Sequence, residues 1–206
     1  RTEGRSPLLR RVLVTVQFGL SIMLLVGVAV VTRQVEFMRS KDLGFDQERL
    51  IYLPLRGETP ASYAVLKEEL LRSPLIPAVT GTSQIPTSLS ANSWNATWEG
   101  KDPENRVLIG VTFADFDYPE TLGIDMAAGR TFRREFATDE GGAFLVNEGV
   151  ARLMGLSPQE AVGKPFDYQG ARGPIVGVMK NYHYTPVQNP LEPMAVIVRP
   201  ADVCFA

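Results

Sequence analysis

The chain has 206 residues, which leaves room for a membrane helix and one domain of about 150 residues with a buried core. Its formal net charge is −2, so no overall basic surface indicates nucleic-acid binding. The single cysteine, Cys204, excludes an internal disulfide framework. The single histidine, His183, excludes a multi-histidine metal site within this chain.

An apolar run at residues 12–31 dominates the N-terminal region. It has no charged side chain, and its polar groups are at Thr15, Gln17 and Ser21. As a helix it would extend about 30 Å, which matches the hydrocarbon thickness of a bilayer. A soluble core helix seldom stays apolar on every face for this length, and a signal peptide has a shorter apolar region before a small-residue cleavage site. We therefore predict a retained transmembrane helix.

The charges on either side of the run predict its orientation. Four basic residues precede it and three follow it (Arg1, Arg5, Arg10, Arg11; Arg33, Arg39, Lys41). Because basic residues are enriched on the cytoplasmic side of membrane helices, we expect residues 1–11 to form a cytoplasmic linker. The large domain then lies outside the membrane.

The helical pattern continues past the apolar run. Val31, Val35 and Met38 follow an i, i+4, i+7 spacing, and charged residues appear around them. Gly44 is suited to the left-handed position that ends a helix. We predict a stalk helix with its cap at residues 32–45, and a stiff stalk is suited to passing motion between membrane and outer domain.

The remaining residues, 46–200, have the pattern of a mixed domain. Residues 49–55 and 79–85 predict strands, and Thr59 predicts the N-cap of a helix between them. That helix carries apolar residues at helical spacing (Tyr63, Leu66, Leu70). Strand, helix and strand together predict one compact βαβ unit.

The sequence after this unit predicts mostly β-strands. Short strands, two helical stretches and a hairpin follow in order (strands 95–99 and 106–113, helical turn 116–122, strand 144–146, helix 147–154, hairpin strands 165–168 and 174–180, strand 194–198).

Four stretches of the sequence, in this order, resemble the FtsX-like/MacB-type permeases of ABC transporters. They are RRVLVTVQFGLSIMLLVGVAVVTRQVEFMRSKDLGFDQERLIYLPL, GIDMAAGRTF, FLVNEGVARLMG with VGKPF, and PIVGVMKNYHYTPV with EPMAVIV. The resemblance is to the periplasmic core domain and the membrane helix that introduces it, and it spans most of the chain.

The resemblance implies an α+β fold in which one N-terminal transmembrane helix and its stalk lead into a two-lobed extracytoplasmic domain. A porter-like lobe would comprise residues 46–90 and 172–200, and an inserted β-rich lobe residues 91–171. It also implies a longer parent with several more membrane helices. The helix that contacts the ATPase in this family lies between other membrane helices, so no ATPase-contact residue is assigned here.

The function implied is that of a non-catalytic permease subunit of the mechanotransmission type, which serves export, extrusion or release of an envelope substrate. The partners implied are a separate ABC ATPase subunit, a second permease copy or paralogue, the lipid bilayer and a periplasmic or outer-membrane protein. The location implied is the bacterial inner membrane. The chain has no GxxxxGK[ST] motif, so we expect no cofactor in it and ATP to be bound by the separate ATPase.

Two alternatives remain open. One is an FtsX-like regulatory scaffold that activates an envelope hydrolase or senses a ligand without transport. The other is a membrane-anchored enzyme that uses His183, although no serine or cysteine nucleophile motif accompanies this residue.

The remaining polar and aromatic clusters predict structure rather than chemistry. Asp115, Asp117 and Glu120 lack the spacing of a calcium loop, so we expect solvated turn residues. We expect Asp139 and Glu140 in an exposed loop, and His183 packed between two tyrosines. Trp94 and Trp98 are four residues apart, so on one strand both would face the same side, as part of the inserted lobe's core or a partner patch. No catalytic, cofactor-binding or metal-binding residue is predicted.

Overall fold

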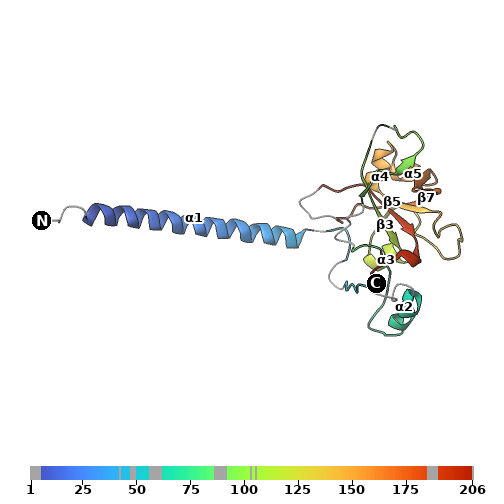
Figure 1. The fold of residues 1–206 in the computed structure, drawn as a ribbon, viewed down its shortest axis with the longest axis horizontal. Coiled ribbons are helices and arrows are strands. Elements are labelled where there is room, and N and C mark those ends of the chain that lie inside the picture. The colour runs from blue at the N-terminus through green and yellow to red at the C-terminus, as the bar shows by residue number, and fades with distance from the viewer. Residues whose placement is uncertain are drawn as a thin grey trace. The chain divides into compact units, whose positions relative to one another are not determined.

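The computed structural model describes residues 6–41, 43–46, 50–55, 62–85, 92–102, 104, 106–184 and 190–205. The chain divides into two compact units, Arg1–Asp42 and Leu43–Ala206. The first unit holds one long helix, and the second holds a mixed sheet with short helices (Figure 1). A long apolar helix followed by a domain of helices and strands confirms the predicted α+β class.

The first unit is helix α1, Ser6–Ser40, which has 35 residues. At 1.5 Å per residue it is roughly 52 Å long. Pro7 lies in its first turn, where a missing N–H costs nothing. The helix begins before the apolar run, so the predicted linker is helical from Ser6, and residues 1–5 lie outside the described residues. The predicted helical stalk is confirmed to Ser40, since α1 continues to that residue without a break.

The second unit is built on an eight-stranded sheet with the order β1-β3-β8-β5-β7-β6-β2, and β4 pairs with β7. The pairs β3–β8 and β5–β7 are parallel, and the other pairs are antiparallel. The strands are β1 Asn92–Ser93, β2 Ala96–Trp98, β3 Ile109–Ala114, β4 Met126–Gly129, β5 Phe144–Asn147, β6 Pro165–Tyr168, β7 Ala171–Met179 and β8 Met194–Val198.

Side chains of the central strands alternate between two hydrophobic cores. On β8, Met194 and Val196 belong to one core, whereas Ala195 and Ile197 belong to the other. This period of two is the geometry of a strand covered on both faces. Helices α4 (Glu148–Leu153) and α5 (Pro158–Ala161) contribute buried residues to one core, and α3 (Tyr118–Leu122) contributes to the other.

Asn147 shows how the sequence fixes one strand-to-helix turn. Its side-chain oxygen accepts hydrogen bonds from the backbone N–H of Val150 at 3.1 Å and of Met194 at 2.9 Å, and its amide donates to the Glu192 carbonyl at 2.8 Å. The first bond is a helix N-cap, and the other two join the start of α4 to β8 and to the residue two positions before it. The predicted strand 144–146 and the helix after it are confirmed.

The predicted βαβ unit is partly wrong. Its helix is present as α2, Tyr63–Leu71, but residues 50–55 and 79–85 form isolated bridges instead of regular strands. Pro54 and Thr82 each bridge Phe205 in antiparallel sense. The two flanking segments therefore run parallel to each other with the C-terminal segment between them, which is a split arrangement. The predicted N-cap, Thr59, lies outside the described residues.

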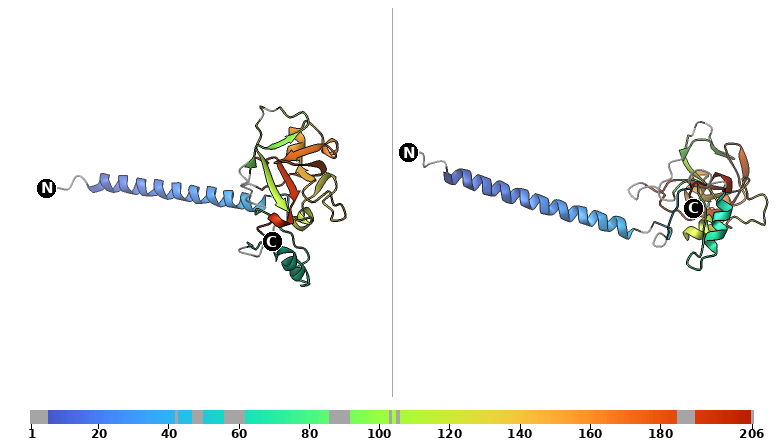
Figure 2. Two further views of the ribbon diagram at one scale, coloured as in Figure 1. Left: turned by 45° about the vertical axis from the view of Figure 1, so that its right-hand side comes forward. Right: turned by 60° about the horizontal axis from the view of Figure 1, so that its bottom comes forward.

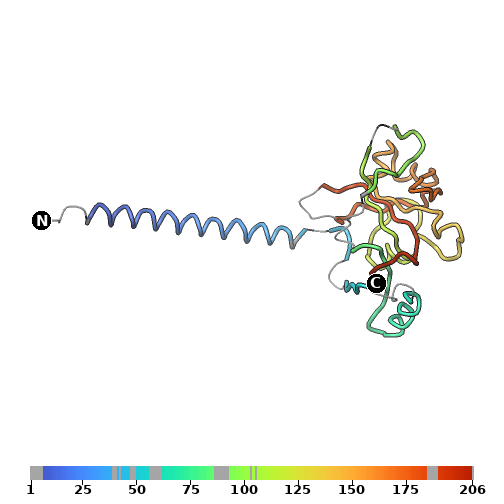
Figure 3. Tube along the Cα trace, viewed as in Figure 1, coloured from blue at the N-terminus to red at the C-terminus, as the bar shows by residue number. Residues whose placement is uncertain are grey.

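The C-terminal segment also supports α2. Val203 packs with Leu55 and Tyr63 in a small third core, and the views in Figure 2 show α2 beside this part of the chain. Figure 3 shows residues 50–55 along the same side. The domain extends past the predicted bound of residue 200, because the 3-10 helix Pro200–Asp202 and the bridge at Phe205 follow β8.

The sheet crosses the predicted lobe boundaries. β3 and β5, placed in the inserted lobe, pair with β8 of the porter-like lobe, and β7 begins at residue 171, where one lobe was expected to end. The division into two lobes remains a prediction.

Two further differences concern the hairpin and the short elements. The turn between β6 and β7 is tighter than predicted, because Gln169 and Gly170 alone connect the strands, both with positive φ (51° and 86°). The sequence pattern missed β1, β4 and α5, which have two to four residues each and are too short to show a period.

Candidate functional site

Helix α1 has the length and composition of a membrane span. Residues Pro7–Met38 form a candidate span whose most apolar window has a mean hydropathy of 2.3. None of that window is buried inside the protein, whereas a core helix of a soluble domain would be mostly buried. Lipid is the solvent in which such a helix is stable, since every backbone hydrogen bond is internal.

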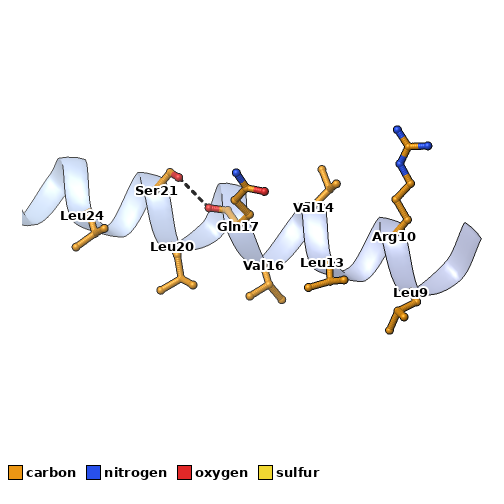
Figure 4. Close-up of a pocket in the computed structure, with 9 residues that line it drawn as sticks. All are labelled: Leu9, Arg10, Leu13, Val14, Val16, Gln17, Leu20, Ser21 and Leu24. Carbon is orange, nitrogen blue, oxygen red and sulfur yellow. Dashed lines mark hydrogen bonds between the residues drawn. The ribbon is translucent and has the colours of Figure 1, made fainter. Parts of the chain in front are cut away.

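Three hydroxyl groups of α1 are satisfied within the helix. Thr15, Ser21 and Thr32 each donate to the backbone carbonyl four residues earlier, at 2.9–3.0 Å. The Gln17 side chain has no hydrogen bond to any residue that the structure describes. A shallow groove of about 630 Å³ runs along this part of α1, with Gln17 and Ser21 on one flank and Val16 and Leu20 on the other (Figure 4).

The second unit begins with an anchor segment, residues 43–46, that is built into its core. The Leu43 carbonyl accepts a hydrogen bond from the His183 N–H at 2.7 Å, and the Asp46 N–H donates to the Leu122 carbonyl at 2.9 Å. Phe45 is 7% exposed and packs edge-on against Tyr182, with ring centroids 6.0 Å apart. The start of the domain is therefore held both by main-chain hydrogen bonds and by an aromatic contact.

Gly44 allows the close approach within the anchor segment. Its φ is +80°, in the left-handed region as predicted. The predicted role as helix cap is wrong, because α1 already ends at Ser40. A Cβ at this position would lie 2.9 Å from the Asn181 carbonyl oxygen and 3.0 Å from the Tyr182 Cα. A larger residue would therefore push the segment away from residues 181–182.

A group of ionised side chains ties α2 to the sheet. Lys67 of α2 pairs with Asp115 at 2.6 Å and with Asp117, and Arg134 pairs with Asp115 at 3.0 Å and Asp117 at 2.9 Å. The Tyr63 hydroxyl also donates to Asp115 at 2.8 Å. The prediction of solvated turn residues is wrong for Asp115, which is buried, because α2 arrives from far along the chain to pair with it.

The ion pairs decide the protonation of this group. Burial alone would raise the pKa of Asp115, but the hydrogen bonds from Lys67 and Tyr63 outweigh burial and hold that pKa below its usual range. Burial and the neighbouring Asp115 carboxylate raise the pKa of the Tyr63 phenol. Asp115 is therefore a structural anion at neutral pH, and its neighbours leave it no role as a general acid.

A second buried carboxylate corrects another expectation. Asp139 was expected in an exposed loop, but its side chain is fully buried and accepts two hydrogen bonds from the Arg130 guanidinium, at 2.6 and 2.9 Å. It also accepts from the Arg133 N–H at 2.9 Å. The loop after β4 folds back to make this pair. Glu140 is exposed, as predicted.

The tyrosines around His183 form a packed cluster. Tyr182 and Tyr184 are each 1% exposed, and the Tyr118 and Tyr182 hydroxyls are 2.8 Å apart. Burial raises the pKa of both Tyr118 and Tyr182. His183 is 9% exposed, and its N–H holds the anchor segment. Within the described residues no group of three or more His, Cys, Asp or Glu is placed to hold a metal ion.

The two tryptophans lie in different parts of the chain's secondary structure. Trp94 lies between β1 and β2 and is 53% exposed, whereas Trp98 lies on β2 and stacks on Phe166 with ring centroids 6.1 Å apart. The condition for a shared face, one strand that carries both, is not met, because β2 begins only at Ala96. A polar groove of about 570 Å³ lies beside Trp98 and is lined by Glu99, Asp167 and Arg172 among others.

Sequence comparison assigns this architecture to a family. The pattern of the MacB-like periplasmic core domain matches residues 18–202, which is most of the chain. The chain belongs to the MacB-like periplasmic core domain family. This family is the outer domain of ABC transporter permeases, which are in general non-enzymatic components of their transporters. An apolar helix joined to a MacB-like periplasmic domain is the organisation of a membrane-anchored protein with an extracytoplasmic domain.

Solved structures resemble this MacB-like chain at low identity. The periplasmic region of MacB from Actinobacillus actinomycetemcomitans is 10% identical with a TM-score of 0.48, over 73% of this chain and 64% of that one. The extracellular domain of the noncanonic ABC-type transporter YknZ from Gram-positive bacteria is 15% identical with a TM-score of 0.46, over 71% of each chain.

A domain of a putative permease from Porphyromonas gingivalis is 18% identical with a TM-score of 0.39, over 59% of this chain and 50% of that one. The MacB-like chain thus spans half of the Porphyromonas gingivalis domain and 64% of the MacB periplasmic region. No curated protein sequence matches the chain.

Proposed function

We propose that this chain is the membrane helix and periplasmic core domain of a mechanotransmission-type permease subunit in the bacterial inner membrane. A separate ATPase subunit binds and hydrolyses ATP in the cytoplasm. Helix α1 relays the resulting movement to the outer domain, which then acts in export, extrusion or release of an envelope substrate. A second permease copy or paralogue and a periplasmic or outer-membrane protein complete the assembly.

The anchor segment carries this proposal. A simple membrane tether needs only a flexible link, but here α1 stays helical to Ser40 and the domain begins three residues later with a segment fixed in its core. His183, Tyr182 and Leu122 hold that segment from two different elements of the domain. A displacement of the chain at residue 43 therefore acts on the packed core and not on a loose loop.

The proposal is tested by interrupting the relay in the full-length parent. Four residues, Gly-Ser-Gly-Ser, are inserted between Ser40 and Lys41, and the control carries the same insertion in the exposed turn between Gln169 and Gly170. Arg152→Cys in a Cys204→Ser background provides a spin-label site on the exposed face of α4. Electron–electron resonance then measures the distance between labels on two copies with and without ATP.

We expect ATP to change the label distance in the parent and in the turn-insertion control, but not in the stalk-insertion variant. ATP hydrolysis by the co-purified ATPase should persist in all three. An unchanged response after the stalk insertion, or a parent that purifies without any ATPase after gentle solubilisation, contradicts the proposal. Export that does not depend on the parent would instead favour the regulatory scaffold.

A further inference from the structure

The polar attachment of α2 to the domain converges on two aspartates. All nine residues of α2 are described, and Tyr63 alone among them is buried. Tyr63 and Lys67 are four residues apart, so they lie on the same face of the helix. The Tyr63 hydroxyl and the Lys67 ammonium contact the Asp115 carboxylate at 2.8 and 2.6 Å, and Lys67 also pairs with Asp117. The position of α2 therefore depends on where these two carboxylates lie.

The two aspartates lie at the start of α3, which has five residues and is roughly 7.5 Å long. Asp117 is the N-cap residue of α3, and Asp115 precedes it by two residues. The Tyr118 N–H donates to the Asp115 carbonyl at 3.2 Å, and the Thr121 N–H donates to the Asp117 carbonyl at 2.9 Å. The backbone of both aspartates is therefore tied to the first turn of α3.

The anchor segment is bound to the opposite end of α3. The last carbonyl groups of a helix have no partner within it, and the Leu122 carbonyl accepts its hydrogen bond from the Asp46 N–H at 2.9 Å. Gly123 caps the helix in the left-handed conformation, and a Cβ there would lie 3.4 Å from the Asp46 Cβ. One short helix thus contacts the anchor segment at its C-terminus and, through the two aspartates, α2 at its N-terminus.

The core holds α3 rigidly between these two contacts. Tyr118 and Leu122 are 0% and 1% exposed. The Tyr118 hydroxyl lies 2.8 Å from the Tyr182 hydroxyl, and the Tyr182 ring packs on Phe45 of the anchor segment. Close-packed cores shift between discrete arrangements and do not deform continuously. A displacement of the anchor segment therefore moves α3 as a unit or breaks its contacts.

We propose that α3 couples the anchor segment to α2, so that displacement of the anchor segment loosens α2 from Asp115 and Asp117. The coupling is reciprocal, because two sites that bias one element change each other's stability by the same factor. Release of α2 therefore loosens the anchor segment in turn. That α2 responds to movement of the stalk rests on the proposed function, whereas the coupling is a property of the resting domain.

Residues 50–55 form a second connection between the anchor segment and α2, since Leu55 packs with Tyr63. The ion pairs of Lys67 do not belong to this connection, because they join α2 to the start of α3. Lys67→Met removes the ammonium group and keeps an apolar side chain, so the packing of Leu55 on Tyr63 is retained. The variant therefore tests α3 and not the covalent connection.

Hydrogen exchange followed by mass spectrometry, on the full chain in detergent, measures the coupling in Lys67→Met. We expect exchange to rise about 5-fold or more in the anchor segment as well as in α2, and to stay unchanged in β8. Arg72→Met is the matched control, because it removes an exposed cation that pairs with Glu69 next to the same helix. Unchanged exchange in the anchor segment of Lys67→Met overturns the proposal. An equal rise in β8 also overturns it, because the domain would then open as one unit.

Gly44→Ala tests the coupling from the other end. It displaces the anchor segment from residues 181–182, so we expect faster exchange in α2 by a similar factor and no change in β8. Gly170→Ala is the matched control, since Gly170 also has a positive φ but no atom within 4 Å of the Cβ position. Faster exchange confined to residues 43–46 and 181–183, or an equal effect of Gly170→Ala on α2, overturns the proposal.

The exchange measurements need no ATPase, so they separate this inference from the proposed function. An unchanged response to ATP after the stalk insertion, with α2 and the anchor segment still coupled, refutes the proposed function alone. A stalk that relays movement while α2 and the anchor segment exchange independently refutes the α3 coupling alone.

Discussion

Helix α1 and strand β8 have similar apolar composition and opposite surroundings. β8 reads MAVIV, and all five residues are buried in the protein, each contributing to one of two cores. The apolar window of α1 has none of its residues buried in the protein. β8 is stabilised by strands distant in sequence, whereas α1 completes its backbone hydrogen bonds alone and takes lipid as its solvent. Apolar composition alone thus does not distinguish a segment of a protein core from a membrane span. The length of the apolar run distinguishes them.

The environments of β8 and α1 are distinguished most clearly by placing one aspartate in each. Ile197→Asp puts an unpaired carboxylate in a fully buried position of β8, and we expect a loss of about 4 kcal/mol or more in unfolding free energy. Ile22→Asp should instead impair membrane integration and leave the outer domain folded. Thermal unfolding followed by circular dichroism, together with carbonate extraction, measures both. Loss of the domain fold in Ile22→Asp would mean that α1 belongs to its core.

Glycine substitution gives a second contrast between crowded and open backbone. A Cβ on Gly177 of β7 would lie 2.2 Å from the Arg130 carbonyl oxygen, so Gly177→Ala should destabilise the domain by about 3 kcal/mol. Gly19 of α1 has no atom within 4 Å of the same position, and Gly19→Ala should leave domain stability unchanged. Urea unfolding of the full chain in detergent compares them. Equal effects would contradict the close packing of β7 on residue 130.

The ion pairs of Asp115 are expected to contribute less to the unfolding free energy than the close packing at Gly177. Asp115→Asn should lower the unfolding free energy by about 2 kcal/mol, because Lys67 and Arg134 lose a buried partner but keep Asp117. Asp125→Asn, which removes an exposed pair with Lys180, is the matched control and should have no measurable effect. A null result for Asp115→Asn would show that α2 is held by Tyr63 and its apolar contacts alone.

Acidification should give the smallest of these effects. The folded-state pKa values of Asp115 and Asp139 lie below the ordinary value of about 4, so their pairing stabilises the fold above that pH. This stability is lost as the pH falls through the lower folded-state values. We expect the urea midpoint of the wild type to fall more steeply below about pH 4 than that of Asp115→Asn. Parallel curves for the two proteins would contradict the depressed pKa of Asp115.

The sequence predicted the segments whose structure depends on neighbours along the chain. Helix α1 with its stalk, the left-handed conformation of Gly44 and the existence of α4 follow from local spacing and residue type. The family assignment also came from sequence, since the order of the four stretches is a property of the whole chain. The candidate site was harder to predict from the sequence. The residues that contact the anchor segment, and those that bury Asp115 and Asp139, are distant in sequence and leave no pattern in the neighbouring residues.

What sequence alone determined is therefore the membrane helix, the mixed character of the domain and most of its longer elements. The helices and tight turns close their hydrogen bonds within a few residues, and the strands were predicted from their short apolar, β-prone runs. Only the tertiary structure decided that Phe205 lies between residues 54 and 82, that α2 pairs with Asp115, and that residues 43–46 are fixed by residues 181–183. These contacts join residues far apart in sequence, so their energies depend on which surfaces the folded sheet brings together.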